Sequence, residues 1–280
     1  MKTATISDLH LDGLARREKT DVDDVRQRLS RAINDEDFEV LVIGGDLSND
    51  AHVSSKIARD MAQDLARPVY YVPGNHDLYN IHNELPTDEI VKFLKDDPNC
   101  LFGRNLDFAD GSSVIGHIGW YDYSYAPQDK FTVEQFMSKS HVGRRWRDVD
   151  FIDWGISDIE LTEQFHKEIA DLYQKVNPER TMLVTHMINH PNFSVSTPSG
   201  STWPFFNAFL GSRGLFEFLA KNPVRTAVCG HVHYRFSFVF WKMEYVCACL
   251  SNKNEWDRVS IGIPLTLEAQ AKDSLYIVDL

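Results

Sequence analysis

The chain has 280 residues, 43% of them hydrophobic, which is enough to bury a sizeable core. Its formal net charge of −12 argues against a surface that holds long nucleic acid, because such a surface needs basic patches over many phosphates. No window reaches the apolar length of a membrane span, and Asp8 and His10 interrupt the first apolar stretch before it could serve as a signal peptide. The four cysteines lack the spacing of a disulfide framework. We therefore expect a cytoplasmic protein without a membrane partner.

Short β-branched runs alternate along the chain with charged stretches of helical period. In residues 21–34, for example, Val22, Val25, Leu29 and Ile33 recur at three- and four-residue spacing, which predicts a helix. The predicted elements, in chain order, are strand 3–6, helix 21–34, strand 40–43, helix 54–65, strand 69–72, strand 114–118, helix 159–176, strand 181–185, strand 225–229, the hairpin 236–240 and 244–249, and strand 275–278.

The order of these elements predicts the fold. Strands that alternate with helices at the start of the chain imply parallel strands joined by right-handed crossovers. We predict an α/β fold, a layered sandwich of two mixed β-sheets flanked by α-helices, with one domain over residues 1–280, because no linker or second core is visible. The irregular, aromatic-rich stretch after Ile118 suggests an embedded cap at about residues 100–160.

Five short segments place polar residues just after predicted strands, where ligands bind in open α/β folds. The segments are Asp8-Leu9-His10, Gly44-Gly45-Asp46, Gly74-Asn75-His76-Asp77, Thr185-His186 and Gly230-His231-Val232-His233. In an extended backbone, residues i and i+2 point to the same side, so Asp8 with His10, and His231 with His233, should each present two ligands together. A glycine directly precedes three of the polar residues, and a residue without Cβ lets the backbone turn sharply.

This set of motifs, in this order from Asp8 to His233, resembles the calcineurin-like metallophosphoesterase family. The resemblance implies a site for two divalent cations. One cation would be bound by Asp8, His10 and His233, the other by Asn75, His186 and His231, and Asp46 would bridge them. Carboxylate, imidazole and amide ligands without thiolates suit manganese first, with iron or zinc as alternatives. Two such ions about 3.5–4 Å apart can share a water, lower its pKa and clamp an in-line displacement at phosphorus.

The resemblance also gives two residues catalytic roles. His76 would donate a proton to the leaving alkoxide or a hydrogen bond to a phosphoryl oxygen, tasks that suit an imidazole. Asp77 would orient His76 or a neighbouring loop. The sequence departs from the family at one point. Many members have an acidic residue three positions after the bridging aspartate, where this chain has Asn49 followed by Asp50, and this departure bears on the support around the ligands rather than on the ligands.

Each motif also has a purely structural interpretation. Asp8 with His10 could be a cap or a surface pair, Asp46 a helix N-cap, and Asn75 a turn residue. Five unrelated strand ends with metal-ligand residue types are hard to explain in that way together. The remaining histidines match no motif, and packed or surface positions are favoured for all of them: His52, His82, His117, His141, His166 and His190. Of these, His190 is the nearest in sequence to a motif and the one candidate for a substrate contact.

Three further features bear on the substrate. Two aromatic-rich stretches without strand or helix period, 119–125 and 189–207, could form walls of the site or cover edges of the core, and the sequence favours neither. The second stretch contains Trp203, Phe205 and Phe206. The tight basic cluster of the chain is Arg144, Arg145 and Arg147, for which a solvated face is favoured over contact with a distal phosphate.

The predicted activity is metal-dependent hydrolysis of a phosphomonoester or phosphodiester by a hydroxide that bridges two divalent cations. The substrate would be a small phosphate ester, with nucleotides among the candidates, because bound cations can reverse the sign of a site within an acidic protein. Two alternatives stay open. One is a nuclease or nucleotide pyrophosphatase, and the other is a non-catalytic scaffold that keeps the fold, against which the complete ligand set argues.

Overall fold

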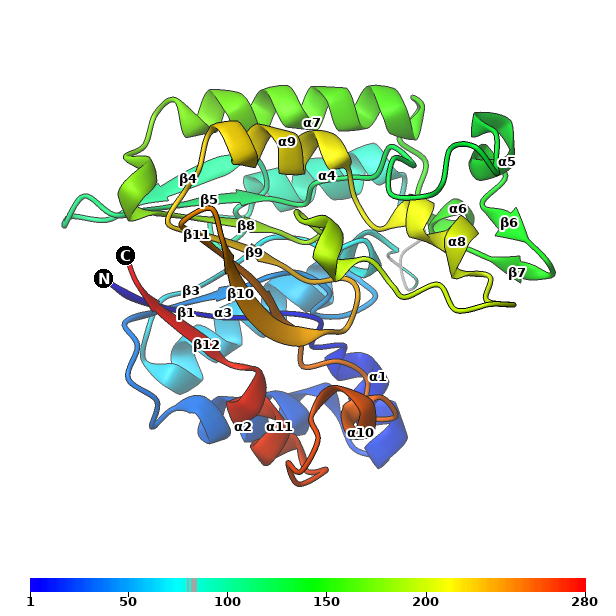
Figure 1. The fold of residues 1–280 in the computed structure, drawn as a ribbon. Coiled ribbons are helices and arrows are strands. Elements are labelled where there is room, and N and C mark those ends of the chain that lie inside the picture. Colours follow the sequence, from blue (N-terminus) through cyan, green and yellow to red (C-terminus); the bar gives the residue numbers. More distant parts are fainter. Residues whose placement is uncertain (80, 82–84) are drawn as a thin grey trace.

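The computed structural model describes residues 1–79, 81 and 85–280. Two large sheets lie face to face, and helices cover the outer face of each (Figure 1). The two chain termini lie side by side at one end of the sheets, where the N-terminal amine of Met1 is 3.5 Å from the carbonyl oxygen of Leu280. The predicted α/β sandwich of two mixed sheets flanked by helices is confirmed.

The smaller sheet has the strand order β12-β1-β2-β3. The strands β1 (Lys2–Ile6), β2 (Val40–Ile43) and β3 (Val69–Tyr71) are parallel, and β12 (Tyr276–Asp279) pairs with β1 in the antiparallel direction. The alternation of strands and helices at the start of the chain therefore produces the parallel strands that it predicts.

The larger sheet has the order β10-β11-β9-β8-β5-β4. Its strands, in chain order, are β4 (Arg104–Asp107), β5 (Ser113–His117), β8 (Thr181–Thr185), β9 (Thr226–Cys229), β10 (Arg235–Phe240) and β11 (Met243–Ala248). The four central strands are parallel, and the two edge strands, β4 and β10, run antiparallel to their neighbours. The predicted hairpin is confirmed as β10 and β11. A separate short hairpin is formed by β6 (Ser140–His141) and β7 (Arg144–Arg145).

The α-helices divide between the outer faces of the sheets and the connecting segments. In chain order they are α1 (Leu11–Glu18), α2 (Val22–Ile33), α3 (Ala51–Leu65), α4 (Thr87–Asp96), α5 (Val133–Met137), α6 (Asp148–Phe151), α7 (Asp158–Tyr173), α8 (Trp203–Phe206), α9 (Arg213–Lys221), α10 (Trp256–Val259) and α11 (Leu267–Ser274). Helices α2 and α11 lie outside the smaller sheet, whereas α7 and α9 lie outside the larger one (Figure 1). None of the helices in the described part of the chain is long and apolar enough to span a membrane.

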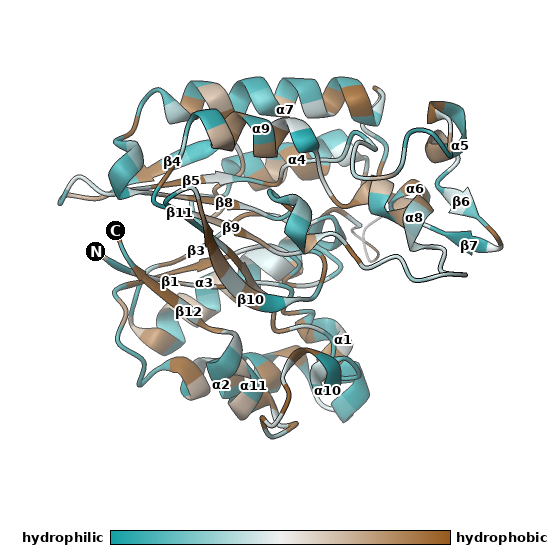
Figure 2. Cartoon of the chain, in the orientation of Figure 1, coloured by the Kyte–Doolittle hydropathy of each residue, from teal (hydrophilic) through white to brown (hydrophobic). Residues whose placement is uncertain are grey.

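Alternate residues of each strand face different layers of the core. In β2, Val42 packs between the two sheets while Leu41 packs toward α2 and α3, and in β8, Val184 faces the other sheet while Leu183 faces the helices of the larger sheet. Figure 2 shows hydrophobic colouring along the strands in the middle of the molecule and hydrophilic colouring on much of the outer helices. Because both faces of the central strands are buried, some are continuous apolar runs, as in Val40–Ile43 of β2.

Helix boundaries account for most differences from the predicted elements. Helix α3 starts at Ala51 rather than at residue 54, because the side chain of Asp50 accepts hydrogen bonds from the N–H groups of His52 and Val53. Four helices of at least eight residues, α1, α4, α9 and α11, lie where no element is predicted. Helices α1 and α4 have no side-chain N-cap and so lack the strongest sequence signal of a helix start.

The stretch for which an embedded cap is predicted, about residues 100–160, divides into two parts. Strands β4 and β5 belong to the larger sheet. Residues 118–157, between β5 and α7, lie outside both large sheets and contain α5, the β6–β7 hairpin and α6, seen on the right of Figure 1. We call residues 118–157 the arm.

Candidate metal centre

All seven residues predicted to bind metal follow strand ends at one edge of the two sheets. They are Asp8 and His10 after β1, Asp46 after β2, Asn75 after β3, His186 after β8, and His231 and His233 after β9. The two sheets are joined beside them, because Ser7 at the end of β1 forms a parallel bridge with Cys249, just past β11. Residues from both sheets therefore converge on one place.

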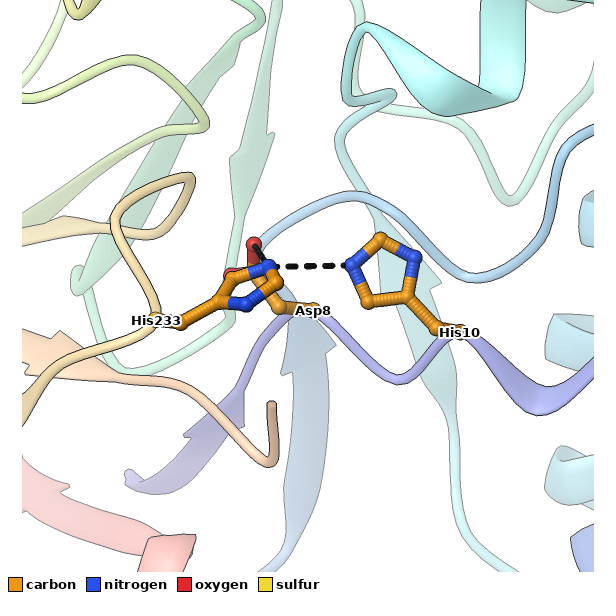
Figure 3. Close-up of side chains that lie close together, drawn as sticks. All are labelled: Asp8, His10 and His233. Atoms are coloured by element: carbon orange, nitrogen blue, oxygen red, sulfur yellow. Dashed lines mark hydrogen bonds and ion pairs between the residues drawn. The ribbon is translucent and has the colours of Figure 1, made fainter. Parts of the chain in front are cut away.

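Asp8, His10 and His233 form the first group (Figure 3). The Nε2 atom of His233 lies 3.1 Å from Nε2 of His10 and 3.4 Å from Oδ1 of Asp8. One potential ligand atom from each of the three residues lies within 4.8 Å of the others. A carboxylate oxygen and two imidazole nitrogens thus surround a common point.

Asn75, His186 and His231 form the second group. The Oδ1 atom of Asn75 lies 3.1 Å from both Nε2 of His186 and Nδ1 of His231, and these two nitrogens are 3.3 Å apart. Asn75 is only 2% exposed and His186 is fully buried. An amide oxygen and two imidazole nitrogens converge here.

Asp46 lies between the two groups. Its Oδ2 is 3.7 Å from Nε2 of His10, and its Oδ1 is 3.4 Å from Nε2 of His186. The carboxylate is 1% exposed. Because one oxygen faces each group, Asp46 has the geometry of a bridging carboxylate, and the structure brings all seven predicted residues together.

The backbone at these residues differs from the extended conformation from which we paired residues i and i+2. The φ angle is 52° at Asp8, 42° at His10, 55° at Asp46, 71° at His231 and 56° at His233. Left-handed backbone is uncommon for residues with a Cβ atom and clusters at functional sites. Asp8 and His10 do converge, through left-handed backbone after β1, whereas His231 and His233 belong to different groups.

Two glycines allow close approach to the carboxylates rather than sharp turns. A Cβ atom on Gly74 would collide with the side chain of Asp46 and lie 2.6 Å from its backbone nitrogen. A Cβ atom on Gly230 would collide with the carboxylate of Asp8. Any side chain at either position would therefore displace one of the two carboxylates.

Acceptors behind the histidine rings set their orientation. The outer nitrogens of His186 and His231 lie 2.9 Å and 3.1 Å from backbone carbonyl oxygens, and Nδ1 of His233 lies 2.5 Å from a carboxylate oxygen of Glu255. Each ring can donate its outer N–H to this acceptor and keep the other nitrogen free for a cation. Glu255 matches no motif and is not among the predicted site residues.

Asp148 on the arm orients Asn75, a role that nothing in the local sequence predicts. The Nδ2 of Asn75 donates to Oδ1 of Asp148 at 2.7 Å, which leaves the amide oxygen toward the two histidines. Tyr79, Tyr121 and Trp146 donate to the same fully buried carboxylate. Because Asp148 lies 73 residues from Asn75 in sequence, only the folded chain shows the contact.

His76 is held by Asn49, the residue at which the sequence departs from the family pattern. The Nδ1 of His76 lies 2.7 Å from Oδ1 of Asn49, and Asn49 in turn donates to Asp12 at 2.6 Å. His76 is half-buried, and one potential ligand atom of His76, with one each from His10 and Asp46, forms a group within 4.8 Å. Asn49 thus supplies the outer support that the family pattern assigns to an acid.

Asp77 holds the loop after β2 and not the ring of His76. Its Oδ2 accepts hydrogen bonds from the N–H groups of Asp46 at 2.8 Å and Gly74 at 2.7 Å. Its Oδ1 accepts from the hydroxyl of Ser54 at 2.5 Å and from two further N–H groups of the loop. Burial, helped by the charge of Asp46, raises the pKa of the Asp77 carboxyl to about 7. Of the two roles left open for Asp77, the contacts support that of orienting a neighbouring loop.

The protonation states of the group suit a cation site. Burial would raise the pKa of the Asp46 and Asp8 carboxyls, but the neighbouring histidines hold both pKa values below the usual range. Burial lowers the pKa of His10 and His231 to about 4, so both rings are neutral at pH 7. Burial would also lower the pKa of His186, yet Asp46 raises it to about 9, so this ring carries a proton that a cation would displace.

A cavity of about 690 Å³ opens onto the centre. Its lining includes five predicted site residues, Asp46, Asn75, His76, His231 and His233. It also includes the arm residues Arg144, Arg145, Trp146 and Arg147. The three arginines are exposed, as a solvated face would be, but they border the site rather than a remote surface.

The aromatic stretches have different roles. Residues 119–125 cover the core, since their tryptophan and three tyrosines are no more than 5% exposed. In residues 189–207, Trp203 lines the cavity, whereas the phenylalanines are buried. His190 is packed among aromatic rings and does not line the cavity. The other motif-free histidines that the structure describes do not line it either: His52, His117, His141 and His166. His82 lies outside the described residues.

The donor set fits divalent cations of the manganese, iron or zinc type, because carboxylates, imidazoles and an amide oxygen supply only oxygen and nitrogen ligands. A layered α/β sandwich with such a group at its strand ends is the architecture of a metal-dependent phosphoesterase. The chain belongs to the calcineurin-like phosphoesterase family, whose model matches residues 1–235. The matched part includes all seven predicted ligands, and the protein is a metal-dependent phosphoesterase, a hydrolase.

Solved structures share the fold. A phosphopantetheinyl hydrolase from Mycobacterium tuberculosis superposes with a TM-score of 0.72 at 14% identity, over 99% of this chain and 95% of that one. The protein TT1561 from Thermus thermophilus has a TM-score of 0.50 at 10% identity, over 99% of this chain and 98% of that one. A comparison with curated proteins found no match.

Proposed function

We propose that the seven converging side chains bind two divalent cations and that the protein hydrolyses a phosphomonoester or phosphodiester there. One cation would be held by Asp8, His10 and His233, the other by Asn75, His186 and His231. The geometry of Asp46 carries this proposal, because its two oxygens face different groups, 3.7 Å from His10 and 3.4 Å from His186. A single cation would need only one of the two Asp46 oxygens and one of the two groups.

Manganese is the first candidate for both cations, with iron or zinc as alternatives. When bound, the cations supply a nucleophile by lowering the pKa of water and offset charge on the phosphoryl group. Cys249 lies beside the site, and its thiol donates to Oδ2 of Asp8 at 3.0 Å. Burial raises the pKa of this thiol well above its ordinary value, so Cys249 stays protonated and leaves the ligand set free of thiolate.

His76 would donate a proton to the leaving alkoxide. Its Nδ1 is engaged by Asn49 at 2.7 Å, which leaves Nε2 available at the cavity that His76 lines. Its backbone N–H donates to Oδ1 of Asp46 at 2.9 Å, so His76 is tied to the bridging carboxylate. Asp77 would act indirectly, because it holds the loop that carries Asp46.

The substrate would be a small phosphate ester, nucleotides included, because a cavity of about 690 Å³ suits a small molecule. We further propose that residues 1–280 form one domain in which the arm acts as an embedded cap. All four cysteines are buried and free, which supports the cytoplasm as the location.

The test measures bound metal beside turnover in two variants. Asp46→Asn is expected to lose metal and activity together. His76→Ala is expected to keep its metal and lose about 100-fold or more in turnover of an ester with an alkyl leaving group. His52→Ala, at an exposed histidine on α3 outside the cavity, is the control and should match the wild type. Identical behaviour of Asp46→Asn and His76→Ala would show that the roles are wrongly assigned.

The same assay separates the alternatives. Manganese-loaded protein is offered 4-nitrophenyl phosphate, bis(4-nitrophenyl) phosphate, nucleotides, an oligonucleotide and a phosphopantetheinyl ester, the last being the class named for the M. tuberculosis structure. Release from the bis-ester alone would indicate a diesterase or nuclease. No release from any ester, with metal bound, would indicate the non-catalytic scaffold.

A further inference from the structure

The segment from Arg144 to Asp148 connects the cavity wall to the metal centre. Asp148 reaches Asn75, and Trp146 donates to Asp148 and stacks on Phe209, with ring centroids 5.4 Å apart. Arg144 lies two residues before Trp146, Arg147 lies between Trp146 and Asp148, and both arginines line the cavity. The two guanidinium groups are therefore attached to a segment whose buried residues fix it against the site.

Arg147 is connected to His76 by a series of rings. Its guanidinium lies 5.0 Å from the ring centroid of Phe151. Phe151 stacks on Tyr79 at 4.6 Å, and Tyr79 lies against His76 at 4.5 Å. Tyr79, in the middle of the series, also donates to Asp148, which ties the series to the arm. The series of rings places the guanidinium of Arg147 on the side of the cavity where His76 lies.

Arg144 contacts helix α8 and Thr202, the residue just before that helix. Its guanidinium donates to the hydroxyl of Thr202 at 2.7 Å and lies 5.1 Å from the ring centroid of Phe206. The guanidinium also lies 5.8 Å from the ring centroid of Trp203, and the hydrogen bond to Thr202 uses one of its N–H groups. The remaining N–H groups can donate to an anion in the cavity.

The charge balance distinguishes these two arginines from other basic residues of the cavity. Arg145 is paired with Asp150 at 2.6 Å, and Arg258 with Glu255 at 2.9 Å. Within the part of the chain that the structure describes, neither Arg144 nor Arg147 has a carboxylate at ion-pair distance. Two arginines with no acidic partner among the described residues, beside a site for phosphate chemistry and in a chain of net charge −12, fit an anionic ligand.

We propose that Arg144 and Arg147 bind a second phosphate of the substrate while its first phosphate is hydrolysed at the metal centre. The inference rests on the proposed function and adds the substrate class: a phosphate ester with two phosphates and a planar or apolar portion. Trp146, Trp203 and Phe236 line the same cavity and offer flat rings to that portion. A nucleoside bisphosphate, or an ester of one, has this chemistry.

The test uses pairs of esters that differ in one phosphate. For a diesterase the pair is the 4-nitrophenyl ester of thymidine 5′-phosphate with and without a 3′-phosphate, and for a monoesterase it is adenosine 3′,5′-bisphosphate and adenosine 5′-phosphate. The manganese-loaded wild type should prefer the doubly phosphorylated member by about tenfold or more in kcat/KM. Arg144→Ala and Arg147→Ala should each lower this preference by about tenfold, mainly through KM. Arg59→Ala, at an exposed arginine on α3 away from the cavity, should keep the wild-type preference.

The outcomes distinguish a failure of the proposed function from a failure of the proposed arginine site. If metal-loaded protein hydrolyses no member of either pair, the proposed function fails. If it hydrolyses both members equally well, or if the double variant keeps the wild-type preference, the arginine site is wrong and the hydrolase stands. Metal content and thermal unfolding are measured for every variant. If an alanine variant is destabilised, the glutamine variant at the same position, Arg144→Gln or Arg147→Gln, takes its place in the comparison. Glutamine keeps most of the packing over the rings.

Discussion

Two regions of the molecule hold their side chains by different means: the turns that carry the predicted ligands, and the arm. In the turns the backbone is constrained, with left-handed φ angles at five ligand residues and glycines in close contact with the carboxylates. At the arm, buried carboxylates gather donors: Asp148 accepts from Tyr121 and Trp146, and Asp158, at the start of α7, accepts from Trp120 and Tyr123. The difference indicates that the backbone places the ligands, whereas a side-chain network from the arm orients one of them.

A glycine substitution in each region should give the largest contrast. In Gly74→Ala the new Cβ would collide with the side chain of Asp46 and lie 2.6 Å from its backbone nitrogen, so we expect loss of bound metal and about a 100-fold lower kcat/KM. Gly143→Ala, in the β6–β7 turn, has φ of 71° and no atom within 4 Å of the added Cβ. It should cost about 1–2 kcal/mol of stability from the left-handed backbone and keep its metal. Metal analysis and thermal unfolding check both variants, and a metal-replete Gly74→Ala protein would contradict the role given to the turns.

Two buried aspartates test the contribution of the arm. Asp148→Asn removes the charged acceptor of Asn75, and we expect about a 10- to 100-fold weaker affinity for the metal near Asn75, His186 and His231. Asp158→Asn is the control, because Asp158 also accepts from aromatic donors and, within the described residues, contacts no predicted ligand, although it is in addition paired with Lys139 at 2.9 Å. It should lower stability without changing metal affinity. Titration with manganese followed by calorimetry measures this, and equal affinities in the two variants would remove the arm from the metal centre.

Local signals explain why so much of the site could be predicted. The strands β1, β2, β3, β8 and β9 are buried runs rich in apolar and β-branched residues, and each predicted ligand lies shortly after one of them, so strand position and residue type together predict the convergence. The mechanism of convergence could not be predicted, because left-handed φ angles at residues such as Asp8 and His231 depend on packing between the two sheets.

Contacts distant in sequence explain the rest. Asp148 and Glu255 carry no motif, and their roles depend on which residues the fold brings beside Asn75 and His233. The sequence pattern likewise could not show that the basic cluster borders the site. A residue such as Arg147 can be exposed to solvent and line the cavity at the same time. Residue patterns thus predict ligands that follow strands and miss the residues that orient them.

Asn49 provides a test within the turns of a residue that acts through orientation alone. Asn49→Ala removes the partner of the Nδ1 of His76, and we expect about a tenfold loss of turnover for esters with alkyl leaving groups. Nitrophenyl esters should lose less, because nitrophenolate leaves without a proton. Asn105→Ala, at a half-buried asparagine that donates to the carbonyl of Leu172, is the control for removal of an amide. An equal loss for both leaving groups would show that Asn49 supports the metal ligands and not the proton donor.

The boundary between the larger sheet and the arm should show a small pH effect on stability. His117 ends β5, its Nδ1 accepts a hydrogen bond from the N–H of Gly119 at 3.0 Å, and burial lowers the pKa of its ring, although Glu168 partly opposes the shift. At pH values above about 6.5 the ring is neutral in both the folded and the unfolded chain, and its contribution to stability is complete. As the pH falls below about 6.5 the unfolded chain takes up the proton first, so stability should decline by up to about 1 kcal/mol over one pH unit. In His117→Asn an amide oxygen replaces the Nδ1 acceptor without titrating, and its unfolding free energy should decline less over the same interval. Denaturant unfolding of both proteins between pH 7.5 and 5.5, with these values chosen to bracket the ordinary pKa of about 6.5, measures the difference in slope. Parallel curves would mean that the junction between sheet and arm is held without the neutral ring.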